Sequence, residues 1–206
     1  PVTGGRVLLD GHCISDGSVP RSEICQHLGM VFQSYDLFNH LTVLENIALA
    51  PVQVQHRDPE EVRCRSRELL ARIGLADKEN AYPRELSGGQ KQRLTIARAL
   101  VKKPEILILD DSASALDFAT DAALRKSLNR LDWKVTTFLV SQRSSSIQQA
   151  DLILVLDNGT LAGKGTHAEL LRTCDTYREI YFSQFPEERA RYSSVSAGNI
   201  MKEVTV

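Results

Sequence analysis

A serine, two glycines and a glutamine, Ser87-Gly88-Gly89-Gln90, could bind an anion at the start of a helix. Ser87 is a favourable N-cap residue, because its hydroxyl can accept a hydrogen bond from a free backbone N–H of the first turn. Gly88 and Gly89 carry no side chains, so a phosphate could reach the bare amides, where the helix dipole favours negative charge. Taken alone, the same residues also fit an ordinary loop that ends in a capped helix.

A second candidate for chemistry is the carboxylate pair Asp110 and Asp111, which follows the apolar run 106–109. This continuous Ile/Leu run after Pro104 is typical of a parallel strand that is buried on both faces. Ligands of α/β proteins bind beyond the carboxyl ends of such strands, so Asp110 stands where ligand chemistry is expected. An acidic residue that merely ends a strand is the common alternative.

The elements that must position these residues alternate between strands and helices. Apolar runs predict strands over 7–9, 28–32, 106–110, 135–140 and 152–156, of which those over 106–110 and 135–140 are expected to be buried. Helical spacing predicts helices over 58–73, 87–101, 119–131 and 177–185, with a short helical turn near 20–24. Thr42 and Thr166 each precede a glutamate by three residues, so both are expected to cap helices. Asp157-Asn158-Gly159 predicts a hairpin turn.

Composition excludes several classes of protein. The net charge of −1 gives no sign of a nucleic-acid surface, and no apolar run is long enough to cross a membrane. The four scattered cysteines are expected to be reduced thiols rather than zinc ligands or disulfides. Because the chain begins with Pro1 instead of methionine, we expect a fragment or a processed product.

The whole run from Tyr82 to Leu100, centred on Leu86-Ser87-Gly88-Gly89-Gln90, resembles the signature motif of ATP-binding cassette (ABC) ATPases. The resemblance covers about residues 4–185 and implies the α/β P-loop NTPase fold, a mainly parallel sheet flanked by helices. One nucleotide-binding domain is expected over 1–185, with a helical subdomain at about 42–101 and a flexible tail over 186–206. The phosphate loop G-x-x-x-x-G-K-[ST] occurs nowhere in the 206 residues, so we expect an N-terminally truncated domain.

The resemblance also implies which residues meet ATP and Mg²⁺. Gln33 resembles the family's Q-loop glutamine, which senses the metal and the γ-phosphate, and Asp110 resembles the Walker B aspartate that holds Mg²⁺. Both are therefore expected metal residues. The signature residues Ser87, Gly88, Gly89 and Gln90 would bind, in trans, the nucleotide of a partner domain.

Two positions depart from the pattern of active ABC ATPases. In active members, the position of Asp111 holds a glutamate, which is the base that polarises water. The position of Gln142 holds the switch histidine. The Asp111 carboxylate is one methylene shorter and would end about 1–1.5 Å short of the expected place. A glutamine can hydrogen-bond phosphate but carries no charge near neutral pH. We expect Asp111, Gln142 and Gln33 to be the catalytic residues of a weak site.

The partners implied by the resemblance are a second ABC ATPase domain and a transmembrane permease subunit, with no nucleic acid. Ser114-Ala115-Leu116-Asp117 resembles the D-loop, which contacts the partner domain. The protein would then lie at the cytoplasmic face of the cell membrane, as a peripheral subunit that couples ATP binding and hydrolysis to transport.

The two halves of the chain resemble different branches of this family. Residues 4–103 resemble importers of polar amino acids, whereas residues 107–185 resemble the degenerate half of a heterodimeric multidrug exporter. Uptake of polar amino acids is the preferred interpretation. The alternatives are a weakly hydrolysing exporter domain, a non-hydrolysing regulatory subunit, and a soluble ABC ATPase of repair or translation. The importer-like segment after Gln33 argues against the last. The isolated chain is expected to be inactive or very weak.

Overall fold

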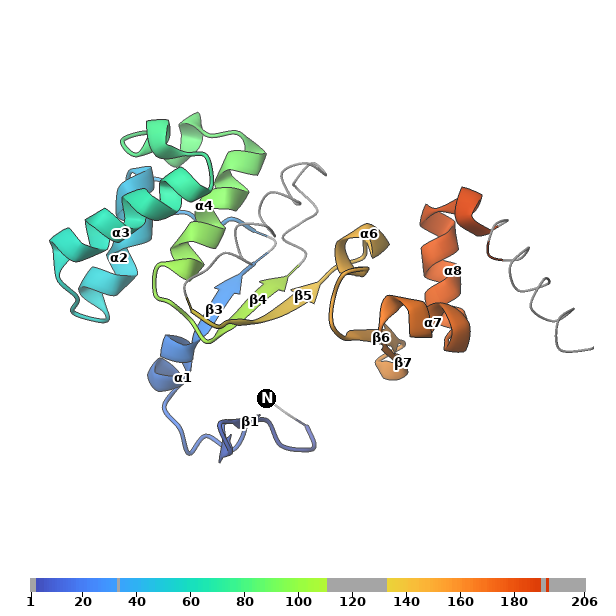
Figure 1. Cartoon of the computed structure of the whole chain (residues 1–206). Coiled ribbons are helices and arrows are strands. Elements are labelled where there is room, and N and C mark those ends of the chain that lie inside the picture. Colours follow the sequence, from blue (N-terminus) through green and yellow to red (C-terminus); the bar gives the residue numbers. More distant parts are fainter. Residues whose placement is uncertain (1–2, 33, 111–132, 190–191, 193–206) are drawn as a thin grey trace, which may run out of the picture. The chain divides into compact units, whose positions relative to one another are not determined.

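The computed structural model describes residues 3–32, 34–110, 133–189 and 192. It divides into two compact units, Pro1–Val140 and Ser141–Val206, and each is described here by itself. Figure 1 shows the course of the chain through its helices and strands.

The first unit contains a three-stranded parallel sheet in the order β3-β4-β5. Strand β3 (Leu28–Val31) pairs with β4 (Ile106–Asp110), and β4 pairs with β5 (Thr136–Val140). Parallel strands need a long crossover between them, and here the crossover from β3 to β4 consists of helices. The expected α/β fold with a parallel sheet is confirmed.

The burial expected for β4 and β5 is only partly correct. Along β4, Leu107 and Leu109 are buried but the alternate residues are half-buried, so one face is much better covered than the other. Strand β5 was expected to be buried, yet four of its five residues are exposed and Leu139 is half-buried. The reason is positional: β5 is an edge strand of the described sheet, so composition alone overstated its burial.

Three helices pack together beside β3 and form most of the first unit's core (Figure 1). They are α2 (Val43–Gln53), α3 (Pro59–Arg72) and α4 (Gly88–Leu100), with the short 3-10 turns η1 (Ala76–Lys78) and η2 (Pro83–Glu85) between α3 and α4. The caps of α2 and α3 follow the sequence. Thr42 and Glu45 form a reciprocal capping box, and Asp58 caps α3 with Pro59 at its first position.

Helix α4 lies close to β3 because of a glycine. A Cβ at Gly29 would lie 2.9 Å from Pro104 Cγ and 3.3 Å from the Ala99 carbonyl oxygen, so a larger residue would push the strand from the end of the helix. The N-terminal part of the unit consists of a small hairpin, β1 (Leu8–Leu9) with β2 (His12–Cys13), and α1 (Arg21–His27).

The second unit has its own core around a β-hairpin and two helices. Strands β6 (Ile153–Asp157) and β7 (Thr160–Gly165) are antiparallel, and Asn158 and Gly159 at their turn have the positive φ angles that the predicted hairpin requires. Short α6 (Ser144–Ile147) precedes the hairpin. After it, Thr166 caps α7 (His167–Thr173) through a capping box with Glu169, as predicted, and α8 (Asp175–Gln184) follows. Residues 186–189 are helical as well.

Within the described residues, no helix is both long enough and apolar enough to span a membrane. The four cysteines form no disulfide in the structure.

Candidate functional site

The N-terminus of α4 presents backbone amides at the surface. Ser87 Oγ accepts from Gln90 N over 3.3 Å, and Gln90 Oε1 accepts from Ser87 N over 2.9 Å, which completes a capping box. The first amides of a helix have no intrahelical partner, and this box engages only that of Gln90. The amides of Gly88 and Gly89 therefore remain available at the positive end of the helix dipole. The arrangement suits a phosphate oxygen.

The loop 34–42 contacts this helix start. Its Tyr35 hydroxyl lies beside Gly88, where an added Cβ would be only 3.1 Å from the phenolic oxygen. An open cavity of about 340 Å³ adjoins the contact. It is lined by Tyr35, Asp36, Leu37, Asn39, Pro83 and Lys91. The loop is therefore positioned directly beside the candidate phosphate-binding amides.

A buried amide from α2 holds the middle of this loop. Asn46 is fully buried, and its Oδ1 accepts from Phe38 N over 2.9 Å. Its Nδ2 donates to the carbonyl oxygens of Phe38, Leu41 and Thr42 at 2.9–3.1 Å. The Phe38 and Thr42 carbonyls also accept from backbone N–H groups, whereas the Phe38 N–H and the Leu41 carbonyl are bonded through Asn46.

An arginine from α4 holds the start of the same loop. Arg98 Nη1 donates to the Asp36 carbonyl oxygen over 2.6 Å, and its guanidinium lies 5.8 Å from the centre of the Phe38 ring. Burial lowers the pKa of Arg98 from its ordinary value, and the nearby Asp36 carboxylate opposes that shift. The loop therefore contacts both ends of helix α4, at Gly88 near the start of the helix and at Arg98 near its end.

Asp110 ends β4, where its side chain is half-buried. Among the described residues, no group of three or more His, Cys, Asp or Glu side chains could hold a metal ion. Mg²⁺ is often bound by only one or two carboxylates together with substrate phosphates and water, so a single carboxylate at this strand end fits such a site. Asp110 is the described residue that would hold the ion.

Gln142 belongs to the second unit and is exposed in the turn before α6. Its backbone carbonyl accepts from Gln184 Nε2 over 2.8 Å. The remaining sequence-predicted site residues, Gln33, Asp111 and the segment Ser114, Ala115, Leu116 and Asp117, lie outside the described residues. The predicted helix over 119–131 lies outside them as well. Of the predicted residues, the structure thus places the signature run, Asp110 and Gln142.

Sequence reasoning missed four residues that contact the segments around the predicted site residues: Tyr35, Asn46, Arg98 and Gln184. Asn46 left a usable signal, because it is an amide on the apolar side of α2, next to buried Ile47. The others left none. An arginine, a tyrosine and a glutamine at half-buried or exposed positions are common, and their partners lie up to roughly sixty residues away in the sequence.

Comparisons with known proteins identify several similar proteins. The family model described as "ABC transporter" matches residues 1–114. The L-cystine transport system ATP-binding protein TcyN of Escherichia coli is 39% identical over 167 residues, covering 80% of this chain and 67% of that protein. The glutamine transport ATP-binding protein GlnQ of the same organism is 36% identical, covering 89% and 77%.

A solved structure is also similar. A bacterial Atm1-family ABC exporter with ATP bound superposes with a TM-score of 0.77 at 34% sequence identity. The match covers 88% of this chain but only 32% of the exporter chain.

Proposed function

This chain belongs to the ABC transporter family of ATP-binding proteins, and we propose that it is the ATP-binding subunit of a transporter for the uptake of polar amino acids. Members of this family are ATPases, so ATP binding and hydrolysis follow from membership. The uptake of amino acids is supported by relatives whose names specify cystine and glutamine transport. The observation that carries the proposal is the start of α4, where two glycine amides are available beside a serine cap.

The chain's own residues would act on ATP in the following way. The Gly88 and Gly89 amides and the Ser87 hydroxyl would contact phosphate oxygens of a nucleotide held by a second ABC domain. Asp110 would hold Mg²⁺, which neutralises phosphate charge when it is bound. We further propose that Gln33 would help to hold that ion and sense the γ-phosphate, and that Ser114, Ala115, Leu116 and Asp117 would contact the partner domain.

Hydrolysis at this chain's own site is expected to be slow. Asp111 would be the base, but an aspartate carboxylate would end about 1–1.5 Å short of the place that a glutamate reaches. Gln142 would contact the γ-phosphate as a neutral group. These two residues favour a second candidate function, a weakly hydrolysing domain of a heterodimeric exporter. The similarity to an exporter over 88% of the chain also supports that candidate.

The proposal includes a location in the cell and two protein partners. The ATP-binding protein would pair with a second ABC domain and with a transmembrane permease, at the cytoplasmic face of the membrane. It would bind no nucleic acid, in keeping with the net charge of −1.

Uptake by cells that contain the assembled transporter tests the proposal. Gly89→Asp places a negative charge where the phosphate is expected. A negative charge at a helix N-terminus is itself stabilising, and the new Cβ would meet no atom within 4 Å beyond its own chain neighbours and helix backbone. We expect folding to persist and uptake of labelled cystine or glutamine to be lost. Gly4→Asp adds the same charge at another open glycine and should leave uptake unchanged.

Two results would contradict the proposal. Undiminished uptake by Gly89→Asp would show that the start of α4 binds no nucleotide. Absence of amino-acid uptake in the unsubstituted transporter, together with ATP-dependent efflux of a hydrophobic dye, would favour the exporter.

A further inference from the structure

The turn that carries Gln142 is held by a side chain from α8. Gln184, the last residue of that helix, accepts through Oε1 from Ser144 N over 2.9 Å. Its Nε2 donates to the Gln142 carbonyl oxygen over 2.8 Å. All three residues belong to the second unit, and they lie some forty residues apart in the sequence. A single amide thus bridges both ends of the turn.

Only one orientation of the Gln184 amide satisfies both contacts. A backbone carbonyl can only accept and a backbone N–H can only donate, so Oε1 must face Ser144 and Nε2 must face Gln142. Ser144 is the first residue of α6, and such an N–H has no intrahelical partner. Ser144 is also buried, and the Arg143 side chain supplies no cap hydrogen bond. Gln184 therefore caps α6 from another helix.

Helix α8 holds Gln184 in place through a second contact with the same region. Tyr181, one turn earlier, is buried, and its hydroxyl donates to Glu188. Gln148, directly after α6, donates through Nε2 to that hydroxyl over 3.4 Å. Helix α6 is therefore attached to α8 at its start and just beyond its end. The position of the turn depends on α8 instead of on local residues alone.

We propose that Gln184 is a positioning residue for Gln142: its two hydrogen bonds fix the turn 141–144, which carries the side chain assigned above to the γ-phosphate. The inference rests on the proposed function, because Gln142 is assigned to ATP hydrolysis there. It adds that the rate of hydrolysis depends on an uncharged amide at the end of α8. A glutamine that only helps α8 to pack would have no such effect on hydrolysis.

Backbone amide exchange measured by NMR tests the contact itself. Gln184→Leu removes both hydrogen bonds at nearly constant size, so Ser144 N–H should exchange about three- to tenfold faster, the factor that one net hydrogen bond carries. Gln149→Leu, at an exposed glutamine just beyond α6, is the matched control and should leave Ser144 unchanged. Equal exchange in the two variants would overturn the proposal.

Gln184→Glu tests the two hydrogen bonds of the Gln184 side chain separately. A carboxylate can still accept from Ser144 N, but it cannot donate to the Gln142 carbonyl and repels it. Ser144 should therefore stay protected while the Gln142 end of the turn moves. Gln149→Glu adds the same charge nearby as the control. Loss of Ser144 protection in Gln184→Glu would contradict the assigned orientation of the amide.

ATP turnover of the assembled transporter tests the positioning role. Gln184→Leu and Gln184→Glu should both lower kcat about three- to tenfold, with an unchanged KM for ATP, because Gln142 is assigned to the γ-phosphate step and not to nucleotide capture. The Gln149 variants should keep both constants. An unchanged kcat in either Gln184 variant would overturn the proposal. Absence of turnover in the unsubstituted transporter would instead contradict the proposed function, and Ser144 exchange, which needs no nucleotide, separates the two failures.

Discussion

The buried amide of Asn46 joins α2 to the loop beside the signature run through four hydrogen bonds. Asn46→Ala would leave the Phe38 N–H and the Leu41 carbonyl without their side-chain partner, whereas the Phe38 and Thr42 carbonyls keep their backbone donors. We expect the free energy of unfolding to fall by about 2–3 kcal/mol, because unsatisfied buried polar groups are costly. Urea denaturation of both proteins measures this. Asn39→Ala in the same loop, at an exposed asparagine, should cost far less, and an equal cost would contradict the role of Asn46.

The proposed slow hydrolysis is assigned to Asp111 and Gln142. Asp111→Glu should restore the reach of the base and raise ATP turnover of the assembled transporter, since a well-placed general base contributes about 10²–10⁴-fold. Adding Gln142→His should raise turnover further, although not as a simple product, because residues that act as a unit are non-additive. Steady-state turnover measures both. If the unsubstituted protein already turns over ATP as fast as the double variant, Asp111 is an adequate base.

For single residues, the sequence predicted local roles better than contacts with distant residues. Ser87 as a cap and Asp110 at a strand end could be predicted, because each depends on neighbours in the chain. The contacts of Arg98 with the loop and of Gln184 with the turn could not, since they depend on how distant elements pack. The role of Asp111 rests on family resemblance alone.

Within the described part of the chain, capping boxes begin the α-helices α2, α4 and α7. In α2, hydrogen bonds from the Thr42 backbone and hydroxyl hold the pKa of Glu45 below its ordinary value. A lowered folded-state pKa stabilises the fold above the unfolded-state pKa, and this contribution is lost as the pH falls through the folded-state pKa.

Glu45→Gln tests that contribution, because glutamine keeps the capping geometry but does not titrate. We expect the unsubstituted protein to lose more stability than Glu45→Gln when the pH is lowered from 6 to 3. Urea unfolding midpoints at several pH values measure the difference. Identical pH dependence in the two proteins would show that Glu45 contributes nothing to acid sensitivity.

The elements themselves were predicted well where the signal is local. All three boundaries marked by Ser or Thr caps are confirmed, and so is the 157–159 turn, because side chain and backbone meet within three residues. The burial of β5 was wrong, because it depends on what covers a strand and not on its composition. The caps could be predicted because they depend on neighbouring residues, whereas the burial of β5 depends on which other elements cover it.

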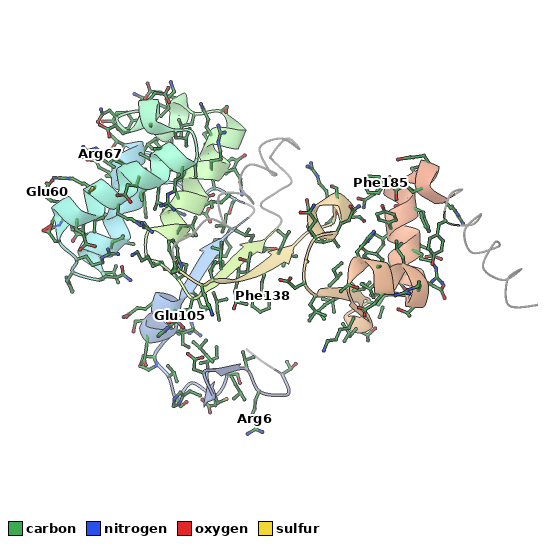
Figure 2. The ribbon with its side chains drawn as sticks, viewed as in Figure 1. Arg6, Glu60, Arg67, Glu105, Phe138 and Phe185 are labelled. Carbon is green, nitrogen blue, oxygen red and sulfur yellow. The ribbon has the colours of Figure 1, made fainter. Side chains whose placement is uncertain are left out.

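In the molecule as a whole, the first unit leaves apolar side chains uncovered on one face of its sheet. Met30, Ile108 and Phe138 form one row across β3, β4 and β5, and Met30 and Phe138 are 43% and 54% exposed. Figure 2 shows Phe138 on the face of the sheet away from α4. Exposed apolar rows of this kind promote association.

Phe138→Lys should reduce binding of a hydrophobic dye by the isolated 206-residue chain and increase its soluble fraction. Thr136→Lys adds the same charge on the same face of β5 without removing apolar surface, so it should have the smaller effect. Dye fluorescence and light scattering measure the two variants against the unsubstituted chain. A monomeric chain that binds no dye would show that this row is covered in solution.

The parallel order of the sheet also governs when it can form during synthesis. Strand β3 pairs with β4, which leaves the ribosome roughly eighty residues later, so at about 5–20 residues per second β3 waits several seconds for its neighbour. Helices α2, α3 and α4 are all synthesised within that interval and pack mainly on one another. The helical segment can therefore fold first and shield β3 through the close approach at Gly29. A substitution that delays α4 would lengthen the time during which a nascent strand edge is open to other chains.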